Sequence, residues 1–231
     1  MGETFVISLG GSLIVPEEID TDFLKEFKTL ILSQVQKGKK FIIITGGGKT
    51  CRKYNKAAME IVDASKEDLD WIGLTVCNVN AQLLRVVFRE DACKKVFYDV
   101  REEGLKDSIL QYPIVIGGTL EPGHSSDYDA VLAAKNINAK KIINLSNTDY
   151  VYDSDPRINP QAKKIEEISW SDYRNIIPKE WTHAGLNSPF DPVASQIAQE
   201  AGIEVIIMNG KPIENLANVL EGKGFAGTRI Y

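Results

Sequence analysis

Three glycine-rich turns in this 231-residue chain each follow an apolar run rich in β-branched residues and each lead toward a helix-like segment. The turns are Gly10-Gly11-Ser12, Gly46-Gly47-Gly48 and Gly117-Gly118-Thr119. Glycine lets the backbone turn sharply and approach a ligand closely. A helix that begins behind such a turn presents free N–H groups and a partial positive charge, which suit phosphate. Three such turns therefore predict a site that binds several phosphates at once.

Apolar runs and amphipathic stretches alternate along the chain, which predicts an α/β fold with a mainly parallel sheet covered on both faces. We expect strands at residues 4–9, 40–45, 94–97, 112–117, 140–145 and 204–208. We expect helices at 20–37, 50–64, 68–89, 126–137 and 191–202, the last capped by Gly202, and a short helix from Pro212 to near Gly222. The glycine turns then lie at the carboxyl ends of strands, where open α/β sheets bind ligands.

The alternation changes near residue 146, before a turn-rich stretch from Asp153 to Pro160. This break predicts two lobes, 1–145 and 146–231, within one domain and on one continuous sheet.

The bulk composition narrows the class of protein. Net charge is −5 and the pI about 5.2, with both signs mixed along the chain, which argues against a nucleic-acid or anionic-membrane partner. We expect no membrane span, because no apolar stretch approaches the roughly 20 residues that one needs, and no signal peptide. Cys51, Cys77 and Cys93 have no metal-ligand spacing and are expected to be reduced, structural thiols of a cytoplasmic protein.

The segment Gly46 to Thr50 ends like a P-loop, but Ile43 stands where the leading glycine is required. A dinucleotide-binding fingerprint is also excluded, because Cys51 occupies its third glycine position. The remaining interpretation is a tight turn with cations on the first helical turn. We expect Arg52 to contact phosphate through its guanidinium fork, whereas Lys53 and Lys56 belong to a solvated face.

Two polar segments allow more than one interpretation. Between Gly117 and Asp127, Ser126 or Asp127 is expected to cap the next helix, and the same hydroxyl and N–H groups can bind a nucleobase or phosphate. His124 in this loop is either a ligand contact or structural. The strand end Asn144 to Asp149, followed by Tyr150-Val151-Tyr152, suits a nucleoside or an unliganded hairpin.

The order of these motifs resembles the amino acid kinase superfamily, and within it the archaeal-type uridylate (UMP) kinases. The resemblance runs through nearly the whole chain and depends on the spacing of its pieces. These pieces are residues 8–12, 46–49 with Arg52 to Tyr54, 70–73, Asn80-Ala81, 119–127, 146–149, 151–152, 155–156, 162–164, Ala184-Gly185, Asp191-Pro192 and Gly227-Thr228.

The resemblance implies a three-layer αβα sandwich of the carbamate kinase type that transfers a phosphoryl group from ATP, with Mg²⁺, to UMP. The implied UMP lobe is 1–145 and the ATP lobe 146–231. The implied ATP contacts are Ser8, Leu9, Gly10, Gly11, Ser12, Gly48, Arg52, Ser146, Asn147, Tyr152 and Asp155. The implied UMP contacts are Gly47, Asp70, Thr119, Gly123, His124, Ser125 and Ser126, with Asp70 on a ribose hydroxyl. Arg52 and Lys49 are the expected catalytic cations, no protein metal ligand is expected, and the family implies a homo-oligomer such as a hexamer.

Four positions depart from the family pattern. Ser8 stands where many members have lysine, Glu121 is an additional residue in the monophosphate loop, Tyr150 replaces glycine, and Asn78 replaces arginine. These departures leave two alternatives open: a kinase of the same fold for another phosphate or carboxylate acceptor, and a nucleotide-binding relative without turnover.

Overall fold

The computed structural model describes residues 3–181 and 188–231. The strands are β1 (Thr4–Leu9), β2 (Lys40–Thr45), β3 (Ile114–Gly117), β4 (Lys141–Ser146), β5 (Val151–Tyr152), β6 (Lys164–Ile165), β7 (Glu167–Ile168), β8 (Glu204–Asn209) and β9 (Thr228–Ile230). The helices are α1 (Gly11–Ile14), α2 (Thr21–Gln36), α3 (Gly48–Ile61), α4 (Lys66–Phe88), α5 (Gly104–Gln111), α6 (Ser126–Ile137), α7 (Trp170–Ile176), α8 (Pro192–Ala201) and α9 (Ile213–Leu220), with a 3₁₀ turn at Arg89–Asp91.

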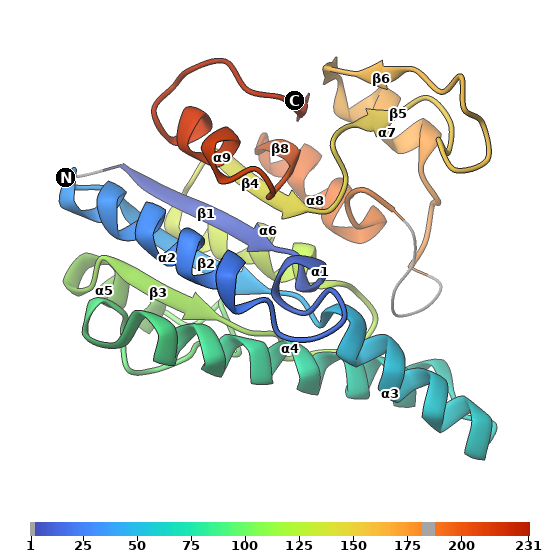
Figure 1. Ribbon diagram of the computed structural model, residues 1–231, viewed down its shortest axis with the longest axis horizontal. Helices are drawn as coiled ribbons and strands as arrows, with labels where there is room; N and C mark the ends of the chain where they lie inside the picture. The colour runs from blue at the N-terminus through green and yellow to red at the C-terminus, as the bar shows by residue number, and fades with distance from the viewer. Residues whose placement is uncertain (1–2, 182–187) are drawn as a thin grey trace.

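Seven strands form one sheet in the order β3-β2-β1-β4-β8-β9-β7. Figure 1 labels the first five strands of this order. The first five are parallel, β9 runs antiparallel to β8, and β7 pairs in parallel with β9. Strand β1 lies between β2 and β4, so the chain crosses to both sides of its first strand. This arrangement opens a crevice beyond the carboxyl ends of β1, β2 and β4.

Helices cover both faces of the sheet, which confirms the predicted fold class. On one face, Phe27 of α2 and Phe88 of α4 are fully buried in a cluster that also contains Leu216 of α9. On the other face, Ala130 of α6 and Ala194 of α8 pack in a second cluster. The central strands are apolar along almost their whole length because both of their faces are covered.

Local sequence signals explain where several helices begin and end. Ser65 and Asp68 form a capping box at the start of α4, and Asp191 caps α8 ahead of Pro192. Gly202 ends α8 in the left-handed region at φ +59°, as predicted. The cap of α6 is Ser125, whose side chain accepts from the N–H of Asp127, so the expectation of Ser126 or Asp127 was wrong by one or two residues.

Some elements differ from the prediction. Residues 94–97 form no named strand; only isolated bridges join Ala92 to Ile114 and Phe97 to Gly117, because this segment runs along the edge of β3. The short elements α1, α5, α7, β5, β6, β7 and β9 were not predicted, since runs of two to eight residues carry little periodicity.

Helix α4 reaches the length and hydropathy of a membrane-spanning helix, with a mean hydropathy of 1.3 over a window in Lys66–Asp91. Our expectation that no apolar stretch approaches this length was therefore wrong. The helix nevertheless places Asp70, Gly73 and Asn80 against the rest of the protein, and Asn80 donates to the carbonyl of Gly46 at 2.7 Å. These contacts are typical of a helix that belongs to the core of the fold.

Candidate active site

The first two glycine turns contact each other through bare backbone. A Cβ on Gly11 would lie 2.0 Å from the nitrogen of Gly48, and one on Gly46 would lie 2.7 Å from the nitrogen of Gly11. Gly48 also has φ +65°, a conformation that favours glycine. No side chain fits between the turns, so their N–H groups lie close together beyond β1 and β2, as the sequence predicted for a phosphate site.

The turn after β1 also reaches the end of β4. The N–H of Gly10 donates to the carbonyl of Leu145 at 2.7 Å, and a Cβ on Gly10 would lie 3.4 Å from the Cα of Ser146. Helix α3 begins at Gly48 without a side-chain cap, which leaves its first N–H groups available, apart from that of Lys49, which donates to Val15. The structure thus brings together the predicted ATP residues of 8–12, Gly48 and Ser146.

A cavity of about 610 Å³ lies between the second and third glycine turns and α4. We call it the glycine-turn cavity, and its walls are Gly47, Gly48, Cys51, Arg52, Asp70, Gly73, Leu74, Cys77, Thr119, Glu121, Pro122, His124, Ser125, Ser126 and Trp181. Six of the seven predicted UMP residues line it; the seventh, Gly123, lies in the same loop.

The loop 119–125 is held at four points. Asn78 both donates to the carbonyl of Thr119 and accepts from its N–H, at 3.0 and 2.9 Å. The N–H of Gly123 donates to Asp70 Oδ2 at 3.0 Å, and the N–H of Ser125 donates to Asp191 Oδ2 at 2.7 Å. Glu121 pairs with Arg101 at 2.7 Å. The departures at Asn78 and Glu121 therefore fix the loop, and the guanidinium of Arg101 balances the extra carboxylate.

Two wall residues have polar groups that remain free. Asp70 uses Oδ2 for Gly123, while its Oδ1 is buried without a hydrogen-bond partner. Within residues 3–181 and 188–231, no side-chain hydrogen bond or ion pair engages the guanidinium of Arg52. A buried orphan oxygen suits a ligand hydroxyl, and a free guanidinium suits a phosphate.

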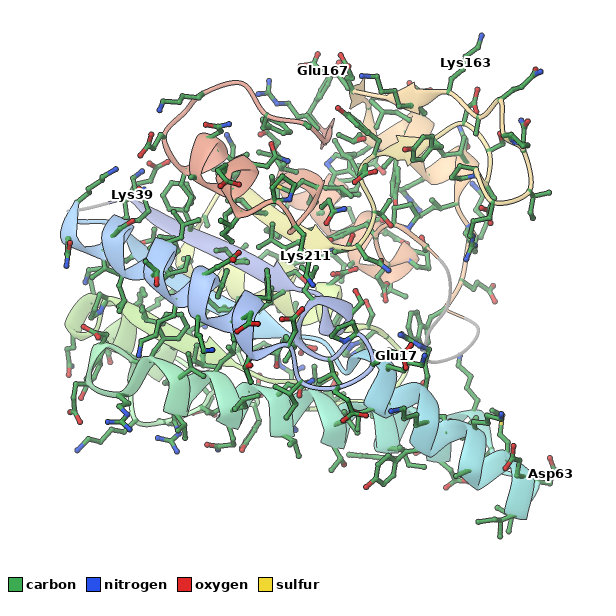
Figure 2. All side chains as sticks on the ribbon, in the orientation of Figure 1. Glu17, Lys39, Asp63, Lys163, Glu167 and Lys211 are labelled. Atoms are coloured by element: carbon green, nitrogen blue, oxygen red, sulfur yellow. The ribbon has the colours of Figure 1, made fainter. Side chains whose placement is uncertain are left out.

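Lys49 is placed differently from Arg52. Its ammonium group forms an ion pair with Glu17, which lies in the loop before α2 (Figure 2), and this hydrogen bond lowers the pKa of the Glu17 carboxyl. The side chain is 36% exposed, so the pair lies at the surface. Lys49 thus lies beside the turn with its charge already paired.

A polar network under the turns was missed by the sequence reasoning. Ser8 Oγ and Asn144 Nδ2 donate to Asp127 Oδ1 at 2.8 and 2.7 Å, and the N–H of Asp191 donates to Asp127 Oδ2 at 3.2 Å. Desolvation raises the pKa of Asp127 to about 7, and the nearby charge of Asp191 adds to this effect. The signal in the sequence was a polar residue inside each of two apolar runs, Ser8 and Asn144, which the register of β1 and β4 pairs in the structure.

The remaining predicted ATP residues line a second hollow, which we call the tyrosine cleft. It measures about 1310 Å³ and contains Asn147, Tyr150, Tyr152 and Asp155 together with Ile176 and Pro189. Arg157 donates to both oxygens of Asp155, which holds the pKa of that carboxyl at about 2. The ammonium of Lys164 lies 4.8 Å from the ring centre of Tyr150, which fixes this bulky replacement for glycine at the cleft wall.

The thiols of Cys51, Cys77 and Cys93 are free, and burial raises the pKa of both Cys51 and Cys77.

The predicted motif Ala184-Gly185 and the second histidine, His183, lie outside the described residues.

Comparison with known proteins agrees with this geometry. The profile of the amino acid kinase family matches residues 3–209, which include all three glycine turns and the loop 119–125. The chain belongs to the amino acid kinase family.

Several members of the family are similar to this chain along almost their whole length. The curated uridylate kinase of Pyrococcus abyssi is 34% identical over 94% of this chain and 95% of its own. The curated uridylate kinase of Archaeoglobus fulgidus is 36% identical over 97% of this chain and 98% of its own length. The crystal structure of uridylate kinase from Archaeoglobus fulgidus superposes with a TM-score of 0.80, covering 99% of this chain and 100% of that chain at 33% identity.

Proposed function

We propose that this amino acid kinase is a uridylate kinase, which transfers the γ-phosphoryl group of ATP to UMP and forms ADP and UDP. The observation that carries the proposal is the glycine-turn cavity, whose walls include a free guanidinium and an orphan carboxylate oxygen. The curated uridylate kinases, which match almost the whole length of the chain, support UMP as the acceptor.

The acceptor nucleotide occupies the glycine-turn cavity in this proposal. Asp70 Oδ1 accepts a hydrogen bond from a ribose hydroxyl, which gives the orphan oxygen a partner. Gly47, the loop residues Thr119, Gly123, His124 and Ser125, and Ser126 at the start of α6 surround the rest of UMP. All of these acceptor contacts come from the lobe 1–145.

ATP approaches from the lobe 146–231. Its nucleoside part lies in the tyrosine cleft beside Asn147, Tyr152 and Asp155, and its phosphates lie over Ser8 to Ser12, Gly48 and Ser146. The two nucleotides then meet at the backbone contact between Gly11 and Gly48. Such a placement brings the transferring group to the free N–H groups at the start of α3.

The chemistry follows from positioning and charge. Phosphoryl transfer develops charge on the equatorial oxygens, and fixed N–H dipoles and cations stabilise that charge. Arg52 is the proposed catalytic cation, and Lys49 contributes after release from Glu17. The acceptor phosphate is already ionised, so the reaction needs no strong general base.

Mg²⁺ enters this reaction as part of the MgATP substrate complex. Within residues 3–181 and 188–231, no three carboxylate, histidine or cysteine side chains are grouped to hold a metal. Asp127 lies under the turns, but both of its oxygens accept protein hydrogen bonds. Phosphate oxygens are therefore the proposed ligands of the ion.

We also propose a cytoplasmic homo-oligomer, such as a hexamer, with a role in pyrimidine nucleotide biosynthesis. Helices α3 and α4 expose Tyr54, Trp71 and Val79 at 63, 46 and 63%, and these residues line one apolar hollow. A second copy of the chain would cover this face. Light scattering of the Val79→Glu variant should report smaller particles, whereas Ile158→Glu, which changes an 83% exposed residue elsewhere, should leave the mass unchanged.

The test of the activity is ADP release from ATP and Mg²⁺ with UMP, CMP, carbamate or isopentenyl phosphate offered as acceptor. Stimulation by UMP alone supports the proposal. Stimulation by a different acceptor assigns the site to another small-molecule kinase activity. Nucleotide binding without ADP release under any condition indicates a relative that has lost turnover.

A further inference from the structure

Two buried polar atoms beside the glycine-turn cavity lack partners. Asp129, on the first turns of α6, is 4% exposed, and its Oδ2 makes no hydrogen bond. The His124 side chain is 8% exposed, and its Nε2 is also buried without a partner. A buried carboxyl without a partner is costly, so its presence calls for a physical reason.

The two residues lie against each other. His124 Nδ1 is 3.9 Å from Asp129 Oδ2, and the imidazole stacks on the ring of Tyr128 with centroids 3.8 Å apart. A closure of about 1 Å, within the reach of small side-chain rotations, converts this contact into a hydrogen bond. Nδ1 also lies 3.3 Å from the carbonyl oxygen of Ser125.

The surroundings favour neutral forms of both groups. Burial raises the pKa of Asp129 well above its usual range, Glu121 and Asp99 reinforce this, and Arg101 opposes it. Burial lowers the pKa of His124, while the hydrogen bond to the Ser125 carbonyl and the carboxylates of Asp191, Glu121 and Asp70 oppose that change. Both shifts act toward the neutral forms, a carboxylic acid facing a neutral imidazole.

This pairing decides which ring nitrogen carries hydrogen. If the Ser125 carbonyl were the only partner of the His124 ring, Nδ1–H would donate to it, and Nε2 would carry no hydrogen and could only accept. A protonated Asp129 reverses the tautomer, because its O–H donates to Nδ1 and the ring hydrogen must then lie on Nε2. If the proton moves from Oδ2 to Nδ1, the O–H bond breaks, the N–H bond forms, and Nε2 still carries hydrogen.

We propose that Asp129 is a positioning residue that keeps hydrogen on Nε2 of His124, so that this atom donates to an oxygen of the acceptor nucleotide. The proposal rests on the proposed function for the nature of that acceptor. His124 lines the cavity next to Ser125 and Ser126, and its neighbour Gly123 donates to Asp70. Nε2 is buried without a partner in the free protein, and in this proposal an acceptor oxygen supplies that partner.

The direct test is the ¹⁵N chemical shift of the imidazole nitrogens. The chain has two histidines, so the His183→Gln background leaves His124 as the single signal. We expect a protonated Nε2 in the otherwise unchanged chain and a protonated Nδ1 after Asp129→Leu. Asp129→Asn should return hydrogen to Nε2, because its amide N–H also donates to Nδ1. The same tautomer in all three proteins would overturn the proposal.

Kinetics and unfolding give a second measurement. Asp129→Leu should raise the KM for UMP about tenfold, the equivalent of one lost hydrogen bond, without an equal change for ATP. Asp129→Asn should recover most of that loss. Asp129→Leu should also unfold at a higher urea concentration, which separates weaker binding from misfolding. Equal effects on both substrates would contradict the positioning role.

Failure of the proposed function is distinguishable from failure of this inference. If UMP is not phosphorylated by the unchanged protein, the function is wrong, and the spectra of the free protein alone decide the role of Asp129. A shift of hydrogen from Nε2 to Nδ1 in Asp129→Leu then supports the pairing, and an unchanged spectrum refutes it.

Discussion

Replacing Asp127 by Asn should stabilise the protein progressively as the pH rises. The carboxyl lies under the glycine turns among Ser8, Asn144 and the N–H of Asp191, where desolvation raises its pKa from 3.8 to about 7. Folding then favours the protonated form, so the folded state binds more protons than the unfolded state between these two pH values. Stability contributed by Asp127 is present below pH 3.8 and lost as the pH rises through 7.

The magnitude follows from the same values. Each pH unit between the two pKa values costs the folded state about 1.4 kcal/mol. Between pH 5 and pH 8, the folded state loses stability over the two pH units from pH 5 to the pKa of about 7. This loss amounts to roughly 3 kcal/mol of unfolding free energy. The Asn variant has no charge to desolvate, although its amide N–H cannot accept from Asp191. That lost hydrogen bond costs about 1 kcal/mol and is independent of pH.

The assay is urea unfolding of both proteins without nucleotide at pH 5 and pH 8. We expect the free energy of unfolding of Asp127→Asn, relative to the unchanged chain, to rise by roughly 3 kcal/mol between the two conditions. The control is Asp63→Asn, which changes an exposed carboxylate at the far end of α3 (Figure 2). A difference for Asp127→Asn that stays constant with pH would refute the reasoning.

Three further outcomes follow from the site. Arg52→Ala should lower turnover about 100-fold or more with the fold intact, while Lys53→Ala should stay near the parent rate; steady-state ADP release measures both. Asp70→Asn should raise the KM for UMP more than that for ATP, and equal changes would mean that Asp70 only anchors Gly123. Gly11→Ala should destabilise the protein by about 3 kcal/mol or more, because its Cβ would lie 2.0 Å from the Gly48 nitrogen. Gly224→Ala, where nothing lies within 4 Å, should change stability by less than about 0.5 kcal/mol in the same unfolding experiment.

The central strands and the helices around them could be predicted from the sequence, because apolar runs and apolar periodicity mark them locally. Strands β1 and β2 are mostly apolar, and their glycine turns lie at the carboxyl ends as expected. Helix α2, which covers one face, buries Phe23, Phe27 and Ile31 at helical spacing. The fold class followed from the alternation of these elements, since parallel strands require crossovers.

The polar network of Asp127 was less accessible from the sequence. The residue lies close to Ser8 and Asp191, which are 119 and 64 positions away along the chain. Only the strand order places β1 beside β4 and so brings Ser8 and Asn144 to one carboxyl group. The ion pair between Lys49 and Glu17 could not be predicted from the sequence either, because it depends on the path of the loop between α1 and α2.

The charges around the turns explain how an acidic chain can attract nucleotides. Arg101 balances Glu121, and Asp127 is about half protonated at pH 7, so neither carboxyl strongly repels a phosphate. Arg52 has no competing partner within the described ranges, whereas Lys49 must leave Glu17. An approaching polyanion raises the pKa of Asp127 further and thereby removes the negative charge that opposed it. Phosphate binding at this site therefore depends on two features at least as much as on the cations. These features are carboxyl groups whose charge is paired or protonated, and backbone N–H dipoles.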